Sequence, residues 1–199
     1  MNEQPDELLC FCNRVSRVQV KEAIAAGAST LATVYERSGA GTGPCGGSCR
    51  SQILCLLGEA PTEELEACTL PNQFVEAVSL FNRRYFWECH EVLEHLWLEE
   101  HGERRLFYQG IIQAAAALYH VLNANPKGVI RLAEEARKKL TVYLPKYQGV
   151  SIQRVFDELG KYIEESKQIL GRAGPGFDYD HLPMILIGAT MSEMKTGVR

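Results

Sequence analysis

The chain has 199 residues, of which 46% are hydrophobic and 23% are charged, so disordered, collagen-like and supercharged chains are excluded. The formal net charge is -4, from 21 Lys and Arg against 25 Asp and Glu, and leaves no broad basic field to attract nucleic acid or an anionic membrane. No leader peptide pattern follows Met1, and no apolar stretch approaches the roughly 20 residues that span a bilayer, so we expect a soluble, cytoplasmic protein.

The first segment, residues 8–58, is rich in cysteine and glycine. We predict three short helices in it: Arg17 to Ala26 with Ser16 as N-cap, Leu31 to Glu36 with Thr30 as N-cap, and a third from Ser48 or Cys49 to Gly58. No strand of convincing period is predicted. About 50 residues bury too little apolar surface for comfortable stability, and a bound metal would supply the missing constraint.

Residues 59–72 contain two prolines and four glutamates, which predicts a linker with at most one helical turn. Beyond it, apolar residues recur with the 3.6-residue period of buried helices as far as Leu170. We therefore expect an all-α protein: a small domain (1–58), a linker (59–72) and an α-helical bundle of about five helices (73–199). The irregular tail from Arg172 includes an apolar run, 182–187, that can pack back.

The seven cysteines are an odd number, and disulfides explain them poorly in a cytoplasmic chain. Cys10 and Cys12 form one close pair, and Cys45 and Cys49 form another after 32 intervening residues. Four thiolates in two pairs can hold a structural zinc ion or a [2Fe-2S] cluster, and the tight Cys-x-Cys spacing favours the cluster, with one sequence pair for each iron.

The glycines around the second pair can bring backbone N–H groups close to sulfur. Four basic side chains lie near the pairs in the sequence and could offset the charge of a cluster: Arg14, Arg17, Arg37 and Arg50.

The run Cys10-Phe-Cys12-Asn-Arg-Val-Ser16, the stretch Gly39-Ala-Gly-Thr-Gly, Cys45 and Cys49-Arg50 together resemble the bacterioferritin-associated ferredoxin-like [2Fe-2S]-binding domain over about residues 8–58. The resemblance implies a helix-turn-helix-like fold with Cys10, Cys12, Cys45 and Cys49 as cluster ligands. The second pair is Cys-x3-Cys here, where the commonest family pattern is Cys-x2-Cys. Of the other cysteines, Cys55 is expected to be a core residue, and Cys68 and Cys89 to be packing or incidental thiols.

Polar side chains recur on two neighbouring predicted helices of the bundle. The helices bring imidazole, carboxylate and amide groups to faces that could meet if the helices are antiparallel. The candidates are His90, Glu91, Glu94, Gln113 and His120. These residues fit either a hydrogen-bond network that fixes helix register or a metal or small-ligand site. A second metal ion bound in the bundle is therefore possible. His90 and His95 are five residues apart, which excludes the zinc-protease spacing.

Residues 74–122 also resemble an all-helical family known as a domain of unknown function, number 309, with Arg84 standing where that family often has glycine. The resemblance supports a helical fold and names no reaction. We expect an iron-sulfur protein that acts in electron transfer with a redox partner protein, or in redox or iron sensing. The alternative is a metal-dependent or redox-coupled enzyme whose site is the polar cluster of the bundle.

Overall fold

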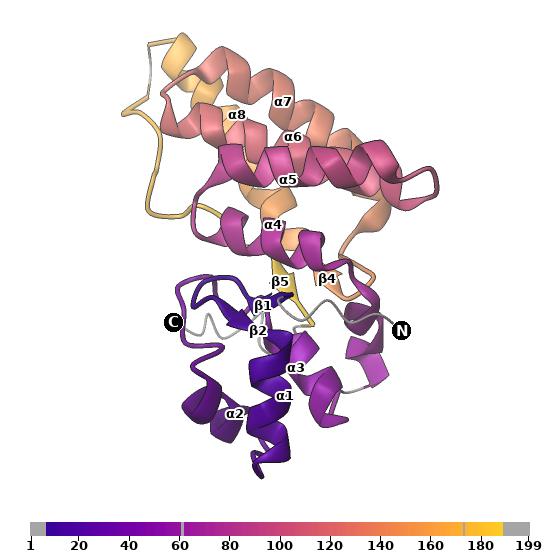
Figure 1. Ribbon diagram of the computed structural model, residues 1–199. Coiled ribbons are helices and arrows are strands. Elements are labelled where there is room, and N and C mark those ends of the chain that lie inside the picture. The colour runs from indigo at the N-terminus through magenta and orange to yellow at the C-terminus, as the bar shows by residue number, and fades with distance from the viewer. Residues whose placement is uncertain (1–6, 61, 173, 189–199) are drawn as a thin grey trace.

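The computed structural model describes residues 7–60, 62–172 and 174–188, and its helices form two groups (Figure 1). The helices α1–α3 pack around one apolar core and α4–α8 around a second, larger one. The expectation of a mostly helical protein is therefore confirmed. The all-α expectation is wrong in one respect, because the described residues also form short strands.

The first group begins with an antiparallel hairpin that the sequence pattern did not predict, β1 (Leu8–Cys10) and β2 (Val15–Ser16). The hairpin is too short to show a two-residue period, and the positive φ of 54° at Arg14 closes its turn. Three helices follow: α1 (Arg17–Ala25), α2 (Leu31–Ser38) and α3 (Arg50–Leu57).

Local capping explains why these three helices lie where the sequence predicted them. Ser16 and Thr30 each accept a hydrogen bond from the backbone N–H three residues on, and both form capping boxes. Gly58 ends α3 in the left-handed conformation that glycine adopts most easily.

A disulfide joins Cys55 on α3 to Cys68 on the 3₁₀ helix η1 (Thr62–Thr69), with the two Cα atoms 6.0 Å apart. This corrects the expectation that these cysteines are a core residue and an incidental thiol. They are 13 positions apart in the sequence, and only the packing of η1 against α3 reveals the bond. Cys89 is a free thiol, fully buried in the larger core.

The second group contains α4 (Asn72–Asn82), α5 (Phe86–Glu99), α6 (Arg104–Leu122), α7 (Pro126–Leu140) and α8 (Gln153–Leu170). Successive helices pack against one another around fully buried aromatic and aliphatic side chains such as Phe74, Phe81 and Leu118. None of the helices formed by the described residues has the length and apolar character needed to cross a bilayer.

Between α7 and α8 the chain forms a short 3₁₀ helix, η2 (Thr141–Tyr143), and two strands, β3 (Lys146–Tyr147) and β4 (Val150–Ser151). Ser151 ends β4, and Ile152 is the N-cap of α8. The predicted packing of the apolar run 182–187 is confirmed, because β5 (Leu186–Ile187) pairs with β4, and Leu182, Ile185 and Ile187 are buried in the larger core. In Figure 1, β5 lies between α4 and the helices of the first group.

Candidate metal centre

The hairpin turn and the loop between α2 and α3 bring four free cysteines together at the edge of the smaller core. Cys10 is the last residue of β1, Cys12 lies in the turn, Cys45 lies in the loop, and Cys49 is the N-cap of α3. Cys10, Cys45 and Cys49 are buried and Cys12 is half-buried. None of the four is in a disulfide.

The thiols form two hydrogen-bonded pairs, and each pair joins the hairpin to the loop. Cys10 pairs with Cys49, and Cys12 pairs with Cys45. The pairs in space therefore differ from the close pairs in the sequence, which the sequence analysis had assigned to one iron each. The hairpin and the loop approach each other so that every pair takes one sulfur from each segment.

Two glycines make this close approach possible. Gly41 has a φ of 76°, and its backbone hydrogen-bonds to both Cys10 and Cys49. A Cβ atom at Gly43 would overlap the Cβ atom of Cys12. Any side chain at Gly43 would therefore push the hairpin away from the loop.

The hydrogen bonds leave one thiol of each pair easier to ionise than the other. The pKa of Cys10 falls to about 5, chiefly because of its hydrogen bond with Cys49, and the same bond raises the pKa of Cys49. Burial raises the pKa of Cys12. Burial also opposes ionisation of Cys45, but hydrogen bonds from Ser48 and Cys12 lower the pKa of Cys45 overall. Thiolate is the form of cysteine that binds metals. Each pair therefore contains one cysteine with a lowered pKa, Cys10 or Cys45, that ionises more easily.

Three polar residues that the sequence analysis did not select surround these thiols. The hydroxyl of Ser48 donates to Cys45 Sγ over 3.2 Å, and the hydroxyl of Ser79 on α4 lies 3.3 Å from Cys12 Sγ. The side-chain amide of Asn82, also on α4, donates to the main-chain oxygen of Cys45 over 2.8 Å. Ser79 and Asn82 are three residues apart on the apolar, buried face of α4, a polar pair on a core face that could have drawn attention to them.

The four arginines near the loops are not equivalent. Arg17 pairs with Glu7 at 3.5 Å, and Arg37 donates to the main-chain oxygen of Ala26, so both are engaged elsewhere. Arg50 acts electrostatically on Tyr35, whose pKa is raised to about 12 by burial and by the neighbouring Cys49. Among Arg17, Arg37 and Arg50, Arg50 is therefore the one that the structure places in the electrostatic surroundings of the thiols.

The five candidate side chains of the bundle share no hydrogen bond or ion pair with one another. Glu91 and Glu94 are exposed on α5. His90 stacks on Trp87 with ring centroids 5.3 Å apart, and its buried Nδ1 has no partner in the described structure; the same holds for Oε1 of Gln113. The Nδ1 atom of His120 lies 3.1 Å from the amide of Asn125 at the end of α6. A catalytic or ligand role for these five residues stays a prediction.

Within the described ranges, no three or more His, Cys, Asp or Glu side chains gather as ligands for a metal ion. The second metal anticipated in the bundle stays a prediction. The four thiols around the hairpin lie as two pairs rather than as one group of this kind.

Comparison with known proteins finds relatives over part of the chain. The uncharacterized protein YpuF of Bacillus subtilis is 38% identical over 64 residues, which cover 31% of this chain and 37% of that protein. An uncharacterized protein of Aquifex aeolicus is 29% identical over 91 residues, 45% of this chain and 26% of that protein. The matched residues thus span less than two fifths of the length of either relative. No solved structure matches significantly.

Family models match two separate stretches. Residues 8–59 match the BFD-like [2Fe-2S] binding domain, and residues 74–132 match a domain of unknown function (DUF309). The predicted boundaries of the domains, 1–58, 59–72 and 73–199, stay predictions. The family models therefore match the chain first as a BFD-like [2Fe-2S] binding domain and then as DUF309, in the order that the sequence predicted.

Proposed function

We propose that the chain binds a [2Fe-2S] cluster through Cys10, Cys12, Cys45 and Cys49, and acts in electron transfer or in redox or iron sensing. The observation that carries the proposal is the arrangement of four free thiols as two pairs. A cluster with two irons needs two thiolates at each iron, whereas a structural zinc ion needs four around one point. The match to the [2Fe-2S] domain supports the same choice.

The residues around the thiols suit a site that concentrates negative charge. The cluster would supply one-electron chemistry, and hydrogen bonds to its sulfur ligands set the reduction potential. Backbone contacts from Gly41 and the hydroxyl groups of Ser48 and Ser79 reach the cysteine sulfurs. Apolar packing against Val34 and Ile53 keeps solvent away from Cys10 and Cys49.

The bundle has a part in this proposal because α4 contacts the site directly. Ser79 reaches Cys12, and Asn82 reaches the backbone of Cys45. A change at the site can therefore alter the contacts of α4, on which α5 packs. If the function is electron transfer, a redox partner protein docks on the chain and exchanges electrons with the cluster.

Anaerobic purification, an absorption spectrum and iron and sulfide analysis test the proposal. We expect a brown protein with about two irons and two sulfides per chain, and loss of the colour in Cys45→Ser. Cys89→Ala, at the free cysteine of the other core, is the matched control and should keep the colour. A colourless protein that carries stoichiometric zinc after anaerobic preparation would refute the proposal.

Limited proteolysis separates the two forms of the function. Sensing requires that removal of iron with a chelator exposes new cleavage sites in α4–α8. Electron transfer requires reversible one-electron reduction while the cleavage pattern stays unchanged.

A further inference from the structure

A cavity of about 550 Å³ lies where the cysteine loop, the turn between α4 and α5, and the C-terminal segment meet. Pro44, the residue before Cys45, forms part of its wall, and Met184 of the C-terminal segment forms another part. The volume lies within the range of pockets that enclose small molecules. None of the four cysteines of the proposed site is among the residues that line this cavity.

Positive charge dominates the lining. Three arginines, Arg83, Arg84 and Arg154, face one carboxylate, Asp180, so the formal charge of these four side chains is +2. Arg83 lies over the ring of Tyr85, 4.8 Å from its centroid, which holds the guanidinium group at the cavity. Among the residues that the structure describes, the guanidinium groups of Arg84 and Arg154 have no hydrogen-bond or ion-pair partner.

The backbone at Arg84 is in an unfavourable conformation for a residue with a side chain. Its φ is 69°, in the left-handed region where glycine would be free of strain. Such conformations are energetically unfavourable for residues other than glycine, and they are concentrated at binding and catalytic sites. The arginine at this turn therefore points to a use for its guanidinium group.

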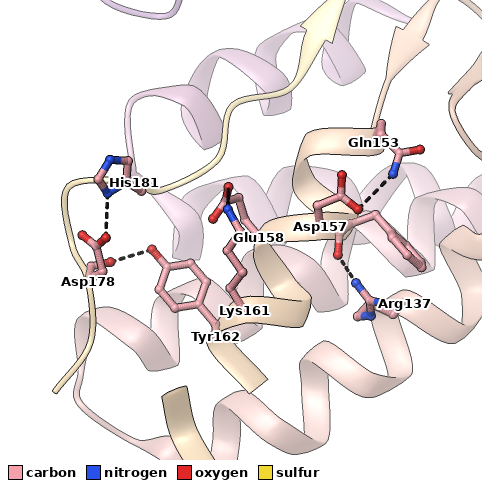
Figure 2. Close-up of polar contacts among 9 residues, drawn as sticks. Arg137, Gln153, Asp157, Glu158, Lys161, Tyr162, Asp178 and His181 are labelled. Atoms are coloured by element: carbon pink, nitrogen blue, oxygen red, sulfur yellow. Dashed lines mark hydrogen bonds and ion pairs between the residues drawn. The ribbon is translucent and has the colours of Figure 1, made fainter. Parts of the chain in front are cut away.

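The opposite wall of the cavity is fixed in place before any ligand binds. Figure 2 shows Tyr162 and His181 both pointing at Asp178, with hydrogen bonds of 2.7 Å to its main-chain oxygen and 2.6 Å to its carboxylate. Further along, Asn82 holds the backbone of Ile185 through bonds at 2.7 and 2.8 Å. These bonds anchor the segment that carries Asp180 and Met184 on both sides, so the pocket is preformed.

We infer that this cavity binds a small, multiply charged oxyanion, either a phosphate ester or a polycarboxylate. Guanidinium groups recognise both kinds of anion through paired N–H donors. The single carboxylate of Asp180 can accept a hydrogen bond from a hydroxyl or amino group of the same ligand. Recognition needs no cluster, so the inference is independent of the proposed redox function.

Isothermal titration calorimetry of the full chain at low ionic strength tests the inference with two probes, inorganic pyrophosphate and citrate. We expect saturable binding at one site, weakened about tenfold or more in Arg84→Gln and Arg154→Gln. Arg131→Gln, at an exposed arginine of α7 outside the cavity, is the matched control and should bind as the wild type does. Arg84→Gly removes the guanidinium group and relieves the backbone, so backbone strain at the turn does not explain weaker binding by that variant.

Binding of pyrophosphate alone supports the site and identifies a phosphate ester as the ligand class, and binding of citrate alone identifies a polycarboxylate. The inference is overturned if neither probe gives a saturable isotherm. It is also overturned if Arg131→Gln weakens binding as much as the cavity variants do, because the anion would then bind to diffuse surface charge.

Discussion

The side-chain amide of Asn82 lies 2.8 Å from the main-chain oxygen of Cys45, a residue 37 positions earlier in the chain. The same amide group donates to the oxygen of Ile185 and accepts from its N–H. One buried side chain on α4 therefore joins the cysteine loop to the C-terminal segment. Three segments that are distant in the sequence depend on it for their relative positions.

Replacement of Asn82 by alanine should lower the free energy of unfolding by roughly 2 to 4 kcal/mol, because three hydrogen bonds are lost and their partners stay buried. Chemical denaturation measures the change. Asn123→Ala is the control, since this exposed asparagine makes one bond, to the oxygen of Tyr119, and its loss should cost less than about 0.5 kcal/mol. Equal effects of the two variants would contradict the joining role of Asn82.

Ser79→Ala should lower the reduction potential of the iron-loaded protein. The hydroxyl of Ser79 contacts Cys12 Sγ, and hydrogen bonds to cluster ligands stabilise the more negative, reduced state. A hydrogen bond of about 1 kcal/mol corresponds to roughly 40 mV for a one-electron couple. Spectroelectrochemical titration gives the potential, and Ser166→Ala, a buried serine of α8 bonded to Tyr162, should leave it unchanged. An unchanged potential in Ser79→Ala would show that this contact does not tune the site.

Gly43→Ala should prevent the two thiol pairs from forming, because the new methyl group would overlap Cys12. Overpacking of this kind costs about 1 to 3 kcal/mol, and we expect it as a sharp loss of bound iron per chain. Gly171→Ala is a suitable control, since its φ is -77° and its added methyl group would stay 3.4 Å from the nearest atom. Full iron content in Gly43→Ala would contradict the close approach of hairpin and loop.

Reduction of the Cys55–Cys68 disulfide should destabilise the chain by up to about 3 kcal/mol, the loop entropy expected for a separation of 13 residues. The double variant Cys55→Ser and Cys68→Ser should show the same loss without a reductant. Thermal unfolding with and without a mild reductant measures it. A wild type that is indifferent to the reductant, together with a fully stable double variant, would contradict a stabilising disulfide.

The stability of the protein should depend on pH through Glu76 on α4. Burial raises the pKa of this carboxyl group above its ordinary value. The folded state therefore disfavours the ionised form of Glu76. The contribution of this group to the stability of the fold is present below its unfolded-state pKa and is lost as pH rises through its folded-state pKa. Glu76→Gln should stabilise the protein at neutral pH and lose that advantage in acid. Denaturation at both pH values tests this, with exposed Glu134→Gln controlling for the loss of one charge.

Several local features could be predicted because their physical causes lie within a few residues. The capping hydroxyls of Ser16 and Thr30 and the left-handed Gly58 mark helix ends by short-range bonds and backbone freedom. The hairpin that carries Cys10 could not be predicted, since strands of two or three residues leave too short a pattern. Arg84 was singled out at sequence level, but only the structure reveals its positive φ and its place at the cavity.

The mostly helical character, the positions of most helices and the two close cysteine pairs follow from the sequence, because composition, periodicity and spacing are properties of neighbouring residues. The pairing of the thiols, the bond between Cys55 and Cys68, and the contacts of Ser79 and Asn82 with the cysteine site depend on the packing of distant segments. These contacts join residues between 13 and 67 positions apart. Their geometry depends on how two apolar cores pack together, and no local pattern encodes it.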